Sequence, residues 1–276
     1  MNRMNIFGKS VTYAFLIVSS LAFIIPFIWM VSTSLKEPGA IFVFPPEWIP
    51  EHFIFHNYKA AWTVAPFNLF LKNTVIIVVL TTLGTVISSS IVAFGFARLV
   101  FKGRNVWFAI LLASMMIPYE VTLIPLYVEF KMLGWIDTLR CLIIPSFFGS
   151  AFNIFLLRQY FLTIPYELDE AAIIDGCSTF KVYWRILLPI VSPALVTVAI
   201  FQVMHAWTDF MGPLIFLNDQ RNYTITLGLN LFRNSYLTEW NNLMAIASLV
   251  TVVPLVIFFI GQKYLIGGIA ASGIKG

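Results

Sequence analysis

Long stretches without a charged residue restrict what this chain can fold into. Six such stretches occur, at residues 10–35, 73–97, 105–119, 141–157, 186–208 and 240–262. The third and the fifth each continue past a single acid, Glu120 and Asp209. A helix needs about 20 apolar residues to cross the hydrocarbon core of a bilayer. Only 11% of the residues are charged, against roughly 25% in soluble domains. The stretches therefore predict an all-α integral membrane protein with six transmembrane helices.

The chain is predicted to form a single transmembrane domain over residues 1–276. The expected helices cover about 11–34, 70–97, 106–128, 139–161, 190–216 and 241–264. Three longer segments stay outside lipid: the loop 35–69, the loop 162–189 and the loop 217–240. With the N-terminus inside, ten of the 17 Lys and Arg fall on the inner side. The positive-inside rule then favours cytoplasmic termini, an inner loop 162–189 and two outer loops.

The inner loop predicts a short acidic helix that projects from the membrane. Pro165 suits a first turn, and Glu167, Asp169 and Glu170 suit the positive end of a helix. Alanines 171 and 172 keep the helix thin, and Gly176 ends it. A second short helix is expected around 178–186. A partner's backbone can approach such a helix closely, and Glu170 can pair with a basic group. Helix physics leaves open an ordinary amphipathic loop whose acids face water.

Several classes of function lack their motifs in this sequence. There is no Gly-x-x-x-x-Gly-Lys-Ser/Thr pattern, so the chain is not expected to hydrolyse ATP. Cys141 and Cys177 lack CxxC partners, and the three His are scattered, so neither a disulfide framework nor a metal site is expected. The charges form no basic patch, which argues against nucleic-acid binding.

A few polar and aromatic residues lie within or beside the apolar stretches. Ionisable groups in a membrane usually face the bundle interior or an aqueous path, and Glu120, His205 and Asp209 are such groups. Trp207 and Phe210 suit stacking on a sugar ring, although structural packing is the favoured interpretation of both. The candidates for a translocation path are Glu120, Trp207, Asp209 and Phe210. For each acid, an interfacial carboxylate or a structural ion pair is the alternative.

The inner loop resembles the signature loop of the membrane subunits of bacterial ATP-binding-cassette importers. The shared pattern is Glu-Ala-Ala, three residues, Gly, nine residues, and Ile-x-Leu-Pro, from Glu170 to Pro189. The resemblance implies the fold of a type I importer permease, with a cytoplasmic coupling helix between helices 4 and 5. It also implies docking on an ATPase through residues of this loop: Glu167, Glu170, Ala171, Ala172, Asp175, Gly176, Ile186, Leu188 and Pro189.

Further motifs resemble carbohydrate-uptake permeases of the maltose type, in particular the shorter subunit. They include Ser34-Leu-Lys36, Pro45-Pro46, Trp48-Ile-Pro50 and Asn57-Tyr58 in the first outer loop. The family often has an acid before Ile41-Phe42, where this chain has Ala40, and Asn after the Trp of helix five, where it has Thr208. The C-terminal tail resembles one that reaches between two ATPase subunits, which implies ATPase contacts for Gly273, Ile274, Lys275 and Gly276.

The resemblance implies a non-catalytic permease subunit in a bacterial cytoplasmic membrane. Its expected partners are a second permease subunit, two ATPase subunits that hold ATP and Mg²⁺, and an extracytoplasmic solute-binding protein. No cofactor is expected on this chain. The expected cargo is a sugar or an oligosaccharide, with glycerol phosphate or an acidic oligosaccharide as the alternative. An ion-coupled secondary transporter or a membrane enzyme is a remote alternative, because neither broken-helix repeats nor a catalytic motif is evident.

Overall fold

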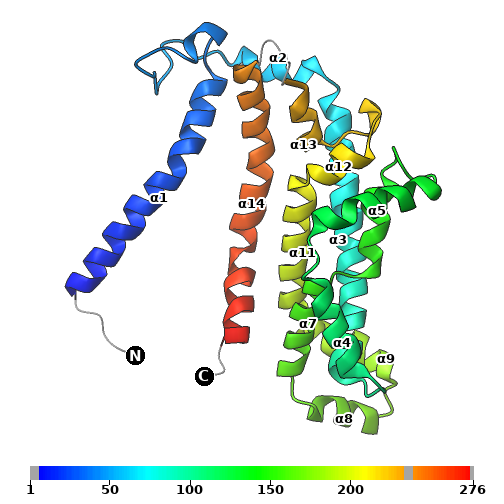
Figure 1. The fold of residues 1–276 in the computed structure, drawn as a ribbon. Coiled ribbons are helices and arrows are strands. Elements are labelled where there is room, and N and C mark those ends of the chain that lie inside the picture. The colour runs from blue at the N-terminus through cyan, green and yellow to red at the C-terminus, as the bar shows by residue number, and fades with distance from the viewer. Residues whose placement is uncertain (1–5, 233–238, 274–276) are drawn as a thin grey trace. The chain divides into compact units, whose positions relative to one another are not determined.

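The computed structural model describes residues 6–232 and 239–273, and every regular element in these ranges is helical (Figure 1). The chain divides into two compact units. Unit 1 comprises Met1–Phe67 and Gly228–Val253, and unit 2 comprises Asn68–Leu227 and Pro254–Gly276. The last helix, α14 (Trp240–Gly273), contributes residues to both units.

Four helical segments of the described chain are long and apolar enough to cross a membrane: Gly8–Ser34, Phe67–Arg98, Arg140–Thr163 and Trp240–Leu265. Two further pairs of helices pass the same criterion together, but each pair is bent. Arg104–Ser114 and Tyr119–Met132 meet at 97°, and Thr179–Ile190 and Ser192–Thr208 meet at 76°. Length and composition therefore give four spans, or up to six if each bent pair is one span.

Three of the expected straight helices are interrupted. The stretch expected as one helix over 106–128 forms α4 (Arg104–Ser114) and α5 (Tyr119–Met132), with an extended Pro118 before α5. Proline has no amide to continue the helical ladder. The stretch 139–161 forms α6 (Arg140–Ile143), η2 (Ile144–Phe148) and α7 (Ala151–Thr163). The stretch 190–216 forms α11 (Ser192–Thr208) and α12 (Met211–Phe216), because Asp209 is extended.

Unit 1 holds the irregular segment between α1 (Ile6–Ser34) and α2 (His56–Val64) in place by side-chain contacts. The Lys36 ammonium is buried, donates to the carbonyl of Glu47 and lies 4.3 Å from the centre of the Trp29 ring. Burial lowers the pKa of Lys36. Asn57 donates to the carbonyls of Ser34 and Lys36 at 2.9 Å. The polar residues of the maltose-type motifs thus fix the irregular segment. Unit 1 also contains η1 (Pro38–Ala40) and η5 (Leu229–Phe232).

Unit 2 is built around α3 (Phe67–Arg98), α7 and α11. Their inner faces share a buried cluster that includes Ala93, Phe94, Leu157, Phe161 and Val198. Within this unit, α8 lies at one end of these helices and α12 at the opposite end (Figure 1). The remaining elements are short: α9 (Thr179–Lys181), η3 (Val182–Leu187), α10 (Leu188–Ile190), η4 (Gln220–Asn222) and α13 (Ile225–Gly228).

Asp137 joins two connecting segments at the α12 end of unit 2. Its Oδ1 accepts the amides of Asn218 at 3.0 Å and Asp219 at 2.8 Å, and the Asn222 side chain at 3.2 Å. Its φ of 61° is unusual for a residue other than glycine, although Asp tolerates it better than most. Burial alone would raise the pKa of Asp137, but these hydrogen bonds outweigh it and lower the pKa.

We expect Asp137→Ala to lower the apparent melting temperature of the purified protein. The change removes three hydrogen bonds, and it puts Ala at a left-handed backbone position that Asp tolerates better. Each net hydrogen bond is worth about 1 kcal/mol. Asp137→Asn is the matched control, since its carbonyl oxygen still accepts these bonds. Because folding lowers the pKa of Asp137, its contribution is present above the ordinary carboxylate range and lost as pH falls through the lowered pKa. Equal melting temperatures for Asp137→Ala and Asp137→Asn would contradict this role.

Candidate functional site

The acidic part of the loop 162–189 forms the helix α8 (Glu167–Ile174). Its first turn carries Glu167, Asp169 and Glu170, whose charge suits the positive end of the helix dipole. The chain turns at Gly176, where φ is 81°. The amide of Gly176 donates to the carbonyl of Ile173 at 3.0 Å, and that of Cys177 to the carbonyl of Ala172 at 2.9 Å. This Schellman pattern ends α8 and gives Gly176 a conformation that other residues rarely adopt.

A buried ion pair ties α8 to α3. Arg98, the last residue of α3, places Nε 3.4 Å from Oδ2 of Asp169, and the two side chains are only 5% and 6% exposed. The Arg98 guanidinium also donates to the carbonyl of Ile164 at 2.8 Å. Burial raises the pKa of Asp169, and the charge of Arg98 opposes that shift. Because buried charges are costly unless paired, removal of either partner is strongly unfavourable.

The second half of the loop is packed into the core of unit 2. Ala172 of α8 belongs to the same buried cluster as Val182, Tyr183 and Leu187 of η3. The Tyr183 hydroxyl lies 2.8 Å from the Ser90 hydroxyl on α3. The loop is therefore attached to α3 both by an ion pair and by a buried hydrogen bond.

The outer surface of the loop combines acids with large apolar side chains. Ile174 is 85% exposed, Phe180 69% and Trp184 58%, and the last two rings stack with centroids 6.5 Å apart. Glu167 and Glu170 are also exposed. Large exposed apolar side chains gathered in one loop commonly mark an interaction site. We call Glu167, Glu170, Ile173, Ile174, Phe180 and Trp184 the loop surface.

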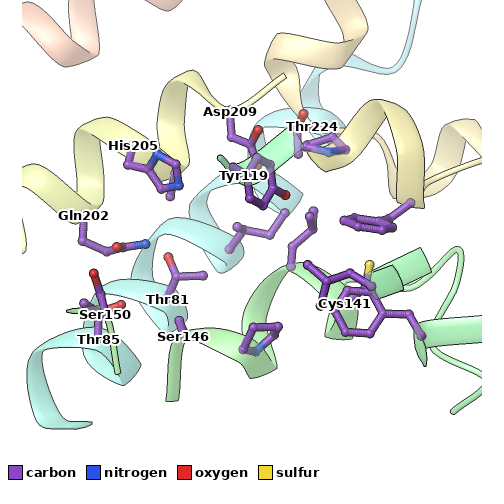
Figure 2. Close-up of a pocket in the computed structure, with 18 of the residues that line it drawn as sticks. Thr81, Thr85, Tyr119, Cys141, Ser146, Ser150, Gln202, His205, Asp209 and Thr224 are labelled. Atoms are coloured by element: carbon purple, nitrogen blue, oxygen red, sulfur yellow. The ribbon is translucent and has the colours of Figure 1, made fainter. Parts of the chain in front are cut away.

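A separate cavity of about 430 Å³ lies within unit 2, and its wall combines apolar with polar residues (Figure 2). Its walls come from α3, α5, the α6–α7 region, α11 and α12. Figure 2 shows that polar side chains from several of these elements line one space: Thr81, Thr85, Tyr119, Ser146, Ser150, Gln202, His205, Asp209 and Thr224. Asp209 stands at the break between α11 and α12, where its Oδ1 accepts the amide of Gly212 at 3.1 Å. The wall thus offers hydrogen-bonding groups together with apolar side chains such as Leu126 and Phe130.

Residues 85–270 match the family model described as the inner membrane component of binding-protein-dependent transport systems. The match includes α8, the Arg98–Asp169 pair and most of the cavity wall. The chain belongs to this family. It is therefore a multi-pass membrane subunit, without catalytic activity of its own, in a system whose ATP is hydrolysed by a separate chain.

Named relatives extend the similarity over nearly the whole chain. The probable ABC transporter permease protein YurM of Bacillus subtilis is 36% identical over 98% of this chain and 89% of its own. The trehalose/maltose transport system permease protein MalG of Thermococcus litoralis is 34% identical over 94% of each chain. A crystal structure of a bacterial ABC transporter involved in the import of the acidic polysaccharide alginate covers 96% of this chain and 98% of its own, at 21% identity and a TM-score of 0.83. That likeness shows a common fold.

The structure divides the predicted docking residues of this permease into two groups. One group is exposed and available to a partner: Glu167, Glu170, Ala171, Asp175, Gly176 and Pro189. The other packs against the buried cluster: Ala172, Ile186 and Leu188. The two alanines thus have different roles, since Ala171 faces outward and Ala172 packs inward. In the tail, Gly273 ends α14, whereas Ile274, Lys275 and Gly276 lie outside the described residues.

Of the four candidates for the translocation path, Asp209 lines the cavity. Trp207 is buried at 5% exposure, and its carbonyl accepts a hydrogen bond from the Thr226 hydroxyl at 2.9 Å. Phe210 packs against a buried cluster that includes Phe130 and Phe216. Glu120 is exposed at the start of α5 and is not among the residues that line the cavity. Packing thus accounts for both aromatic residues.

Sequence reasoning missed Asp169 as a buried partner of Arg98 and missed the neutral members of the cavity wall. Asp169 was one acid among several in a turn. A charged residue at the end of a membrane helix, such as Arg98, is an ordinary boundary signal. Thr81, Thr85, Ser150 and Gln202 carry no charge and leave the uncharged stretches uninterrupted, so only their proximity in the structure identifies them.

Proposed function

We propose that this chain is the permease subunit of an ATP-binding-cassette importer for a sugar or an oligosaccharide, and that the loop surface docks on the ATPase. The observation that carries the docking role is the loop surface itself. It exposes Ile174, Phe180 and Trp184 beside Glu167 and Glu170, on a backbone fixed to the membrane helices. A partner that covers this surface gains apolar burial and pairs its basic groups with the acids.

The transmission of force follows from the attachments of the loop. When ATP binding closes the ATPase dimer, the docked α8 moves with it. The ion pair between Asp169 and Arg98 carries this movement to the end of α3, and Tyr183 carries it to Ser90. The bundle then alternates between inward and outward access. In this arrangement ATP and Mg²⁺ are held by the ATPase, and this chain needs no cofactor.

The partners are proposed to be a second, related permease subunit, two ATPase subunits and a solute-binding protein. The loop 162–189 lies on the cytoplasmic side, together with both termini, as the distribution of Lys and Arg favours. The contacts of the tail, from Gly273 to Gly276, remain part of this proposal.

The proposed cargo rests on the carbohydrate named for one relative and on the charge of the cavity. The Thermococcus litoralis relative is named for trehalose and maltose. Glycerol phosphate or an acidic oligosaccharide is the second candidate. Among the described residues that line the cavity there is a carboxylate, Asp209, and neither Lys nor Arg, which favours a neutral cargo over an anionic one.

We expect a cysteine at position 174 to cross-link to the ATPase. The experiment uses the assembled transporter with Cys177, which lies in the same loop, changed to Ser. Ile174→Cys, at a side chain 85% exposed, should form a permease–ATPase product with a short bismaleimide. Ile124→Cys is the matched control, because Ile124 is 78% exposed on α5 and outside the loop surface. An assembled complex in which position 174 gives no more product than position 124 would refute the docking surface.

A further inference from the structure

We propose that the cavity lined by Asp209 is a binding subsite for a neutral saccharide unit on this subunit. This inference rests on the proposed function and specifies where the cargo is held and which cargo is excluded. Its volume, about 430 Å³, lies within the roughly 300–1,000 Å³ of small-molecule sites. The wall of the cavity carries hydrogen-bonding groups of several chemical kinds. Hydroxyl, amide, imidazole and carboxylate groups are all present, which together donate to and accept from sugar hydroxyls.

The turn that follows α11 holds the Asp209 carboxylate in place. Asp209 ends α11, and the amide of Gly212 holds its Oδ1. A Cβ at Gly212 would lie 2.6 Å from Oδ2, so glycine is needed for the carboxylate to keep this position. A carboxylate held at a helix break accepts hydrogen bonds from adjacent hydroxyls without having to be ordered first, and hydrogen bonds to a charged acceptor are the stronger kind.

The charge of the cavity wall favours a neutral solute. Asp209 has no Lys or Arg beside it among the described lining residues. A phosphate or a uronate in this space would meet a like charge in partly desolvated surroundings, which is unfavourable. A neutral polyhydroxylated solute meets no such repulsion. The subsite therefore selects against the anionic cargoes.

The hydrogen-bonding part of the wall continues into an adjoining cavity of about 220 Å³. This second cavity shares Ser150, Gln202 and His205 with the first. It adds Asn153, which is 5% exposed and whose Oδ1 has no hydrogen-bond partner within the described part of the chain. It also adds the paired rings of Phe152 and Phe201, 6.0 Å apart. Apolar rings beside hydrogen-bonding groups match the two kinds of surface that a sugar presents.

The test titrates the purified, nucleotide-free transporter with maltose and trehalose as neutral probes, and with glycerol 3-phosphate and glucuronic acid as anionic probes. We expect a neutral disaccharide to bind and the anionic probes to bind at least tenfold more weakly. Asp209→Asn should weaken disaccharide binding at least tenfold while the subunits still co-purify. Gln202→Ala, on the same wall but outside the Gly212 turn, should weaken it at least threefold. Asp219→Asn, outside the cavity, is the matched control and should bind as wild type does.

Uptake into proteoliposomes tests the subsite separately from the proposed function and its cargo class. If wild type imports a disaccharide while Asp209→Asn and Gln202→Ala bind and import it as wild type does, the subsite is overturned and the proposed function stands. If wild type binds and imports only the anionic probes, or none of the four, the proposed cargo class fails with the subsite. Tighter binding of an anionic probe by wild type than by Asp209→Asn would also overturn the charge argument.

Discussion

Glu170→Lys is expected to reduce ATP-driven uptake by the assembled transporter at least tenfold. Glu170 is exposed on α8, beside the apolar side chains of the loop surface. Its side chain is in neither of the ion pairs found within the described chain, so reversal of its charge should leave the fold intact. A Lys there would meet a basic group of the ATPase in place of a carboxylate. Loss of a close charge pair across an interface typically costs about 2–5 kcal/mol, which corresponds to a factor of roughly 30 or more.

The measurement is labelled-solute uptake at equal amounts of permease in the membrane, together with the ATPase that co-purifies. Glu129→Lys is the matched control. Glu129 is also exposed but lies outside the loop, and its replacement by Lys changes the net charge by the same amount. Glu170→Gln, which removes the charge without reversing it, should fall between wild type and Glu170→Lys. Wild-type uptake by Glu170→Lys, with normal recovery of the ATPase, would exclude Glu170 from docking.

The distinction between Glu170 and Asp169 shows what the sequence predicts and what it leaves undecided. Both acids stand in the first turn of a helix whose existence, approximate position and end at Gly176 follow from local rules. Which acid faces a partner and which is buried depends on the position of Arg98, far away in the chain. Local propensity carries no information on that distance. Burial separates the two carboxylates, and their predicted effects on mutation differ accordingly.

For the membrane helices too, the sequence predicts some features and leaves others undecided. Uncharged stretches place them well, because crossing a bilayer sets length and composition and little else. Pro118 and Asp209 lie inside two of these stretches, and the chain breaks there. A proline within a membrane helix sometimes only bends it, because neighbouring groups satisfy the freed carbonyl. The sequence therefore does not decide between a bend and a break. The break at Asp209 is what brings its carboxylate into the cavity, which is why this part of the candidate site needed the structure.

Asp169→Ala is expected to lower the stability of the assembled permease more than any other single change considered above. It leaves the Arg98 guanidinium, 5% exposed, without its carboxylate. An uncompensated buried charge typically costs about 3–5 kcal/mol. The α8 segment should then detach from α3, so the variant should show a lower apparent melting temperature, faster proteolysis within 162–189 and little uptake. Arg98→Ala should act in the same direction, and it also removes the hydrogen bond to the Ile164 carbonyl.

A double variant, Arg98→Met with Asp169→Leu, distinguishes the ion pair from the packing around it. Well-packed apolar side chains often replace a buried ion pair with no loss of stability. The double variant should therefore regain most of the melting temperature and protease resistance lost by Asp169→Ala. If the pair serves only to fix α8 on α3, uptake should recover as well. Glu51→Ala, at an exposed acid of unit 1, is the control for loss of a single negative charge. If the double variant loses as much stability as Arg98→Met and Asp169→Leu lose in sum, Arg98 and Asp169 act independently. The proposed link between α8 and α3 would then rest on Tyr183 and Ser90 alone.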